Sequence, residues 1–91
     1  MDQCDKLEQA AELIKVLAHP TRIRILQLLA RRGQLTASAV QHKLQIEQSL
    51  LSHHLIMMNT KGALRKHRKG REVHYSLTDP SLMRIVTLLL S

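Results

Sequence analysis

Residues 36–62, TASAVQHKLQIEQSLLSHHLIMMNTKG, decide the fold of this chain. Apolar side chains recur at helical spacing over residues 36–44, and Thr36 is a good N-cap for that helix. After a tight connection, a second helix is predicted over about residues 47–60, with Gly62 as its stop signal. Two short helices joined by a brief turn predict a helix-turn-helix, although many helical hairpins share this pattern.

The second helix of the predicted helix-turn-helix, which spans about residues 36–60 in all, has an apolar face and a polar face. The apolar face carries Leu51, Leu55 and Met58 at helical spacing. The polar side chains near the start of the helix fall together on the other face; they are Gln48, Ser49, Ser52 and His53. Small hydrogen-bonding side chains at this place are typical of a helix that contacts bases or phosphates, and a glutamine can pair bidentately with adenine.

A strongly basic pair of strands is predicted after the helix-turn-helix. Residues 63–68 and 71–77 flank the turn signal at Lys69 and Gly70, and the second segment alternates apolar and polar residues as a half-buried strand does. A basic β-hairpin directly after a helix-turn-helix predicts a winged helix, with the wing at about residues 63–77. The wing cations expected to contact phosphates are Lys66, Arg68, Lys69 and Arg71.

The charge of the chain also indicates a polyanionic partner. The 91 residues carry 14 Lys and Arg against 7 Asp and Glu, a formal net charge of +7, and the densest basic stretch runs from Lys61 to Arg71. Such a charge favours nucleic acid or an anionic membrane, but the hairpin has little apolar side chain to insert into a membrane. Because Tyr75 is the only aromatic residue, binding to a nucleic-acid duplex is favoured over a mode that stacks unpaired bases on aromatic side chains.

The rest of the chain completes one domain over residues 1–91, of mainly α class with a small β-hairpin. Helical spacing predicts helices over residues 3–18 and 20–32. A last helix is predicted to have Asp79 as its cap and Pro80 as its first residue. The expected order is four helices, two strands and a fifth helix.

The first and last predicted helices are apolar over much of their circumference. A chain of this size buries only about two-thirds of its unfolded surface, so it gains from oligomerisation. We therefore expect a dimer formed through the first and last helices. The alternative is that these two helices only complete the core of a single chain.

The composition disfavours several other classes. Cys4 is the only cysteine, which rules out a disulfide-stapled domain and a Cys-rich zinc finger. No apolar run is long enough to span a membrane and the acidic start is unlike a signal peptide, so a cytoplasmic location is expected. No nucleophile–base pair, Gly-rich phosphate loop or metal triad is apparent, so the chain is not expected to be an enzyme.

Two interpretations of Cys4 stay open. It is either an inert residue or a redox sensor that pairs with the same residue of a second copy. The neighbouring Asp2 and Asp5 oppose thiolate formation and so lower its reactivity.

Three segments of the chain resemble the ArsR/SmtB family of small bacterial winged-helix repressors. They are LAHPTRIRIL at residues 17–26, LSHHL at residues 51–55 ahead of KGAL at residues 61–64, and KGREVHYSL at residues 69–77. The resemblance implies a homodimer that binds an inverted-repeat operator in double-stranded DNA and is released by an inducer, often a metal ion. It also implies that His53 faces the DNA and that His54 faces the body of the domain.

The chain departs from the known metal-sensing members of that family. Where members that sense thiophilic metals carry cysteines in the first helix of the helix-turn-helix, residues 36–40 read TASAV. Members that sense zinc place Asp and His near the start of the last helix; Asp79 matches the first, but Ser81 stands at the second position. The sequence also ends before their distal ligand pair, so we expect no metal and no cofactor, and the inducer is unidentified. Ile56 falls on an outer face where relatives usually carry a charge.

The leading hypothesis is a sequence-specific homodimeric repressor that an unidentified signal releases from its operator. The alternative is a sequence-tolerant architectural DNA-binding protein, whose charge fits but for which the chain has no evident intercalating wedge or long basic arm. The ratio of specific to non-specific affinity at fixed salt distinguishes the two. A phosphate contact from Thr21, Arg22 or Arg24 is a further hypothesis, against a merely solvated helix start.

Overall fold

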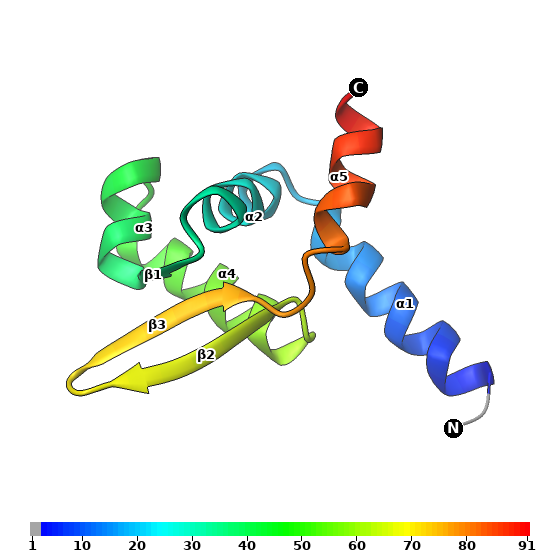
Figure 1. Cartoon of the computed structure of the whole chain (residues 1–91), viewed down its shortest axis with the longest axis horizontal. Helices are drawn as coiled ribbons and strands as arrows, with labels where there is room; N and C mark the ends of the chain where they lie inside the picture. Colours follow the sequence, from blue (N-terminus) through cyan, green and yellow to red (C-terminus); the bar gives the residue numbers. More distant parts are fainter. Residues whose placement is uncertain (1–2) are drawn as a thin grey trace.

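Five helices and a three-stranded antiparallel sheet make up the computed structural model, which describes residues 3–91 and the side chains from Asp5 onward (Figure 1). In chain order the elements are α1 (Gln3–Leu17), α2 (Pro20–Arg32), β1 (Gln34–Thr36), α3 (Ala37–Leu44), α4 (Gln48–Thr60), β2 (Leu64–Lys69), β3 (Glu72–Leu77) and α5 (Leu82–Leu90). The predicted fold class is confirmed, because α3 and α4 form the helix-turn-helix and β2 with β3 forms the wing.

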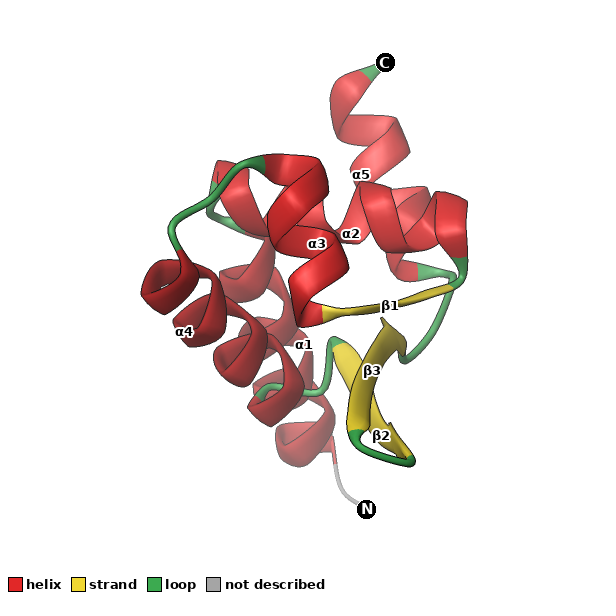
Figure 2. Cartoon of the chain, turned by 90° about the vertical axis from the view of Figure 1, so that its left-hand side faces the viewer, coloured by secondary structure: helices red, strands yellow, loops and turns green. Residues whose placement is uncertain are grey.

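The sheet contains a strand that the sequence did not reveal. Its order is β1-β3-β2, and β1 leads directly into α3 (Figure 2). Leu35 lies opposite Tyr75, and Tyr75 lies opposite Lys66. A strand of three residues is too short to show an alternating pattern, and its partner is about 40 residues away in the chain. The expected two-stranded hairpin is therefore a three-stranded sheet, which ties the wing to the start of α3.

The ends of α2, α3 and α4 agree with the predicted capping. Pro20 is the first residue of α2, and the N–H of Gly33 closes that helix on the carbonyl of Leu29 at 2.8 Å. The hydroxyl of Thr36 accepts from the N–H of Ala39 at 3.2 Å, as expected of an N-cap. The predicted first residue of α4, Glu47, is its N-cap instead.

The predicted start of α5 is wrong by about half a turn. Asp79 does accept from the N–H of Ser81 through its carboxylate, at 2.9 Å. However, the residues after Asp79 form a turn, in which its carbonyl accepts from the N–H of Leu82 at 3.1 Å, and the helix itself begins at Leu82. Proline favours the first turn of a helix, and here it lies in the tighter turn that precedes α5.

One hydrophobic core holds the helices and the base of the sheet together. Its buried members are Val16, Leu17, Ile25, Leu26, Leu28, Leu29, Val40, Leu51, Leu55, Met58, Ala63, Leu64, Tyr75, Leu82 and Val86. They come from every described helix and from both strands of the wing, so burial of these side chains fixes α4 against α2, α3 and the wing.

The two end helices expose much of their apolar surface. On α1, the side chains of Leu7 and Ile14 are 60% and 63% exposed. On α5 the exposed apolar residues are Ile85, Leu88, Leu89 and Leu90. Figure 1 shows both helices projecting from the side of the molecule away from the tip of the wing. No helix among the described residues is long and apolar enough to cross a membrane.

Candidate nucleic-acid interface

The predicted contact residues of α4 gather on one exposed face. Gln48, Ser49, Ser52 and His53 are all exposed near the N-terminal end of the helix. The opposite face is buried, and its members are Leu51, His54, Leu55 and Met58. The structure therefore brings together the four α4 residues that the sequence singled out, on a rigid helix whose other side belongs to the core.

Polar contacts hold the start of α4 and the end of α3. The carboxylate of Glu47 accepts from the N–H groups of Ser49 and Leu50, at 3.0 and 2.9 Å. These two bonds, with Ser49 first, keep the pKa of Glu47 below its usual range. At the end of α3, Arg24 donates to the carbonyl of Leu44 at 3.1 Å. This contact holds α2 to the helix-turn-helix connection and engages one of the two arginines that were candidates for phosphate.

Behind the exposed face, a buried histidine joins α4 to the start of α2. His54 is only 2% exposed, as the resemblance implied. Its Nδ1 accepts from Nε of Arg22 at 3.1 Å, and the His19 ring packs edge-on against it with the centroids 4.5 Å apart. Burial, reinforced by His19, Arg22 and His53, lowers the pKa of His54 below its ordinary value. His54 is therefore neutral at neutral pH and can accept from the arginine.

Sequence reasoning missed the bond between Arg22 and His54. It placed Arg22 at a solvated helix start or on a phosphate, whereas the structure holds its Nε against α4. The two residues are 32 positions apart, so no local pattern joins them. The one available signal was their shared appearance in the quoted segments LAHPTRIRIL and LSHHL.

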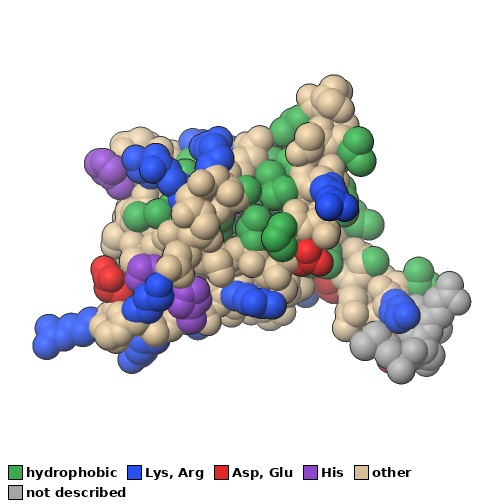
Figure 3. Space-filling model, in the orientation of Figure 1, with side chains coloured by type: hydrophobic (Ala, Val, Ile, Leu, Met, Phe, Trp, Pro, Cys, Tyr) green, Lys and Arg blue, Asp and Glu red, His purple; other side chains and the backbone are tan. Residues whose placement is uncertain are grey.

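The cations of the wing lie at its tip and along its exposed length. Lys66, Arg68, Lys69 and Arg71 are all exposed. The pairing places Lys66 opposite Tyr75 and Arg68 opposite Val73, so these two cations share the sheet face that packs on the helices. Lys69 lies on the other face, opposite Glu72. Figure 3 shows several basic side chains at the hairpin end of the molecule, others spread over the same face, and apolar side chains around α5.

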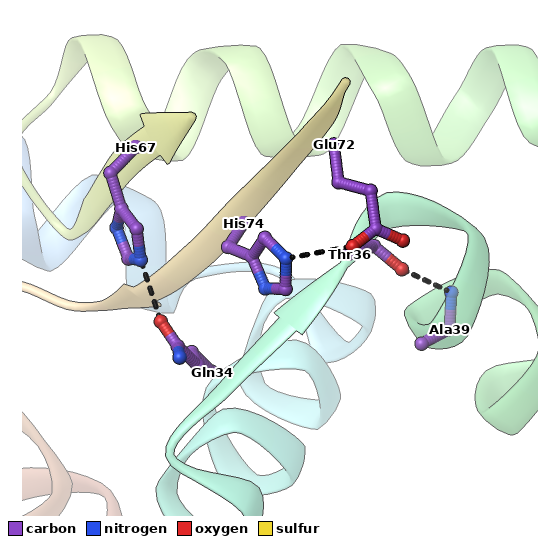
Figure 4. Close-up of polar contacts among 6 residues, drawn as sticks. All are labelled: Gln34, Thr36, Ala39, His67, Glu72 and His74. Atoms are coloured by element: carbon purple, nitrogen blue, oxygen red, sulfur yellow. Dashed lines mark hydrogen bonds and ion pairs between the residues drawn. The ribbon is translucent and has the colours of Figure 1, made fainter. Parts of the chain in front are cut away.

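Along the wing, polar side chains connect all three strands on the sheet face opposite to that of Tyr75 (Figure 4). His67 Nε2 and Oε1 of Gln34 lie 2.6 Å apart, which joins β2 to β1. The rings of His67 and His74 are stacked with centroids 6.0 Å apart, and His74 Nε2 lies 3.4 Å from Oε1 of Glu72. The contact between His67 and Gln34 ties the wing to β1, the strand that leads into α3.

Comparisons with known proteins agree with this geometry. A family model described as a helix-turn-helix domain matches residues 17–58, from the end of α1 through most of α4. The chain is 37% identical over 83 residues to the transcriptional repressor PagR of Bacillus anthracis, which covers 91% of this chain and 83% of PagR. The crystal structure of PagR matches with a TM-score of 0.86 at 36% identity, over 96% of this chain and 99% of that one.

A second relative is the repressor SmtB of Mycobacterium tuberculosis, 39% identical over 80 residues, or 88% of this chain and 58% of SmtB. The chain belongs to the ArsR/SmtB family. Members of this family are winged helix-turn-helix transcriptional repressors, and this ArsR/SmtB protein is a DNA-binding regulator of that kind. The homodimeric DNA-binding domain of Mb0332 from Mycobacterium bovis, a possible ArsR-family regulator, matches with a TM-score of 0.83 at 25% identity, over 99% of this chain and 83% of that one.

The candidate signal-sensing residues of this ArsR/SmtB protein are Asp79 and Cys4. Among the described residues, no group of three or more His, Cys, Asp or Glu side chains is placed to hold a metal ion. Asp79, the one match to a family zinc ligand, is engaged with Ser81, and the bonds from Ser81 lower the pKa of its carboxylate. The side chain of Cys4, the redox candidate, lies outside the described side chains.

Proposed function

We propose that this chain is a single-domain homodimeric repressor that binds an inverted-repeat operator in double-stranded DNA and that an unidentified signal releases it. The observation that carries the proposal is the exposed polar face of α4, backed by buried apolar side chains and adjoined by a basic wing. An α-helix fits the major groove of B-DNA, where base edges can be distinguished. In this proposal the protein acts in the cytoplasm and has no enzymatic activity.

In this proposal the two surfaces have different roles. Gln48, Ser49, Ser52 and His53 contact base edges or nearby phosphates from the major groove, since their side chains donate and accept hydrogen bonds. Lys66, Arg68, Lys69 and Arg71 contact phosphates from the wing, where they add affinity that salt weakens. The pairing of β1 with β3 and the contact between His67 and Gln34 tie the wing to the start of α3, and so link the second surface to the helix-turn-helix.

The exposed leucines of the end helices support the dimer. Leu88 and Leu89 on α5 are 74% and 69% exposed, and Ile14 on α1 is 63% exposed. Large exposed apolar patches are costly on a monomer and mark interaction surfaces. A second copy presents the same two helices, so a two-fold interface would bury these residues on both chains at once. Such a two-fold axis would place two copies of α4 on successive half-sites.

The experiment that tests the function is selection of duplexes from a random pool, followed by affinity measurement at fixed salt. A specific repressor should bind its selected duplex at least about a thousandfold more tightly than a scrambled duplex of equal length. The selected sequence should be an inverted repeat whose half-sites lie about one helical turn apart. Equal affinity for selected and scrambled duplexes would instead support the architectural alternative, which reads charge and not sequence.

A further inference from the structure

An exposed isoleucine lies within the polar face of α4. Ile56 is 60% exposed, although an isoleucine side chain is among those most often buried in proteins. It follows Ser49, Ser52 and His53 by seven, four and three positions, which places all four side chains on one side of the helix. The opposite side is the buried one, with Leu51, Leu55 and Met58 in the core. Nothing within the described chain covers Ile56.

The surroundings of Ile56 favour DNA as the surface that covers it. The exposed apolar residues that suit a second copy lie on α1 and α5, whereas Ile56 continues the row of the proposed base contacts. From Ser49 to Ile56 the helix rises about 10 Å, or roughly three base steps, so a helix in the major groove keeps this whole row near the bases. The basic wing that begins after α4 draws in a polyanion and not an apolar protein surface.

The major groove contains one apolar group, the 5-methyl group of thymine. Isoleucine has no donor or acceptor, so it cannot pair with the polar base edges, but it can pack on this methyl group and exclude water from both. We propose that Ile56 is a specificity-determining residue that reads thymine through its 5-methyl group. The inference rests on the proposed function, since it requires α4 to lie in the major groove.

The test removes the methyl group alone. A duplex selected from a random pool by the full-length chain is resynthesised with deoxyuridine in place of one thymine at a time, which deletes the methyl group and leaves every hydrogen-bonding atom in place. At one thymine in each half-site, we expect the replacement to lower the affinity about three- to fivefold, the value of one buried methyl group. In Ile56→Ala the same replacement should change the affinity by less than about 1.5-fold.

Leu50→Ala is the matched control, because Leu50 is also an exposed apolar residue of α4 but lies to one side of the polar face. This variant should keep the full loss on replacement of thymine. A selective wild-type chain whose affinity does not fall with any replacement, or falls equally in Ile56→Ala, would overturn the role of Ile56. A wild-type chain that does not distinguish selected from scrambled duplexes would overturn the proposed function itself, so the two failures are separate.

Discussion

Nε of Arg22, at the start of α2, donates to Nδ1 of the buried His54 on α4 at 3.1 Å. The bond joins α2, at the centre of the domain, to α4, the helix with the exposed polar face. Because Nδ1 accepts, the neutral ring has its proton on Nε2, and that atom has no hydrogen-bond partner among the described residues. Among the described residues, the bond from Arg22 is therefore the one hydrogen bond to the ring of His54, and it adds to the apolar packing that holds α4 on the core.

Removal of the Arg22 side chain should destabilise the fold. Arg22→Ala leaves the buried Nδ1 of His54 without a donor, and a lost bond of this kind costs about 1–3 kcal/mol. Chemical denaturation followed by circular dichroism measures the change. Arg24→Ala is the control, because Arg24 contacts the exposed carbonyl of Leu44 and water can replace it. Equal losses in the two variants would contradict a special role for the bond to His54.

The lowered pKa of His54 predicts a loss of stability in mild acid. In the unfolded chain the ring titrates near its ordinary value of 6.5, whereas in the folded chain it titrates lower. Between the two values the unfolded state binds more protons, so the free energy of unfolding falls as the pH drops below about 6.5 and the loss levels off below the folded pKa. Denaturation midpoints between pH 7.5 and about pH 5 measure the effect.

His54→Gln is the control for this pH dependence. Glutamine can still accept from Arg22 but does not titrate. The stability of the variant should therefore depend less on pH over the same window. The comparison is internal to each variant, so any constant loss from the substitution cancels. A variant with the same slope as the parent would contradict the role of His54 in the pH dependence.

Neutralising a wing cation should weaken DNA binding at low salt and reduce its salt dependence. Arg68→Ala and Lys69→Ala each remove one proposed phosphate contact, so the slope of log affinity against log salt should fall by about one unit. The loss should be similar for selected and scrambled duplexes, because phosphates carry no sequence. Arg84→Ala, which removes an equal charge from α5, should leave the slope unchanged. Unchanged slopes in both wing variants would contradict the placement of the wing on DNA.

A charge on the exposed face of α5 should separate the two copies. Leu89→Glu places a carboxylate at a residue that is 69% exposed in one chain and that the proposed dimer buries. The variant should sediment as a monomer where the parent sediments as a dimer, and it should lose most of its affinity for a two-half-site duplex. Leu50→Glu tests the same change on α4, away from this interface, and should leave the sedimentation unchanged.

Local patterns were enough to predict most of the elements. Pro20, Gly33 and Thr36 mark helix ends through their own backbone and side-chain chemistry, so their roles can be read without the rest of the fold. The polar face of α4 also follows from the spacing of its residues in the sequence alone. Near Asp79 the same rules misplaced the helix start by about two residues, because a cap and a proline fit the turn before α5 as well as the helix itself.

By itself, then, the sequence determined the winged helix-turn-helix, the location of its basic wing and the excess of apolar surface on the end helices. Only the tertiary structure decided that Gln34–Thr36 is a strand, that Arg22 binds His54, and that His67 of the wing contacts Gln34. Helix periodicity and capping act over a few neighbouring residues, so they are legible in the chain. The other contacts join residues more than 30 positions apart, and burial in a common core is what brings them within reach.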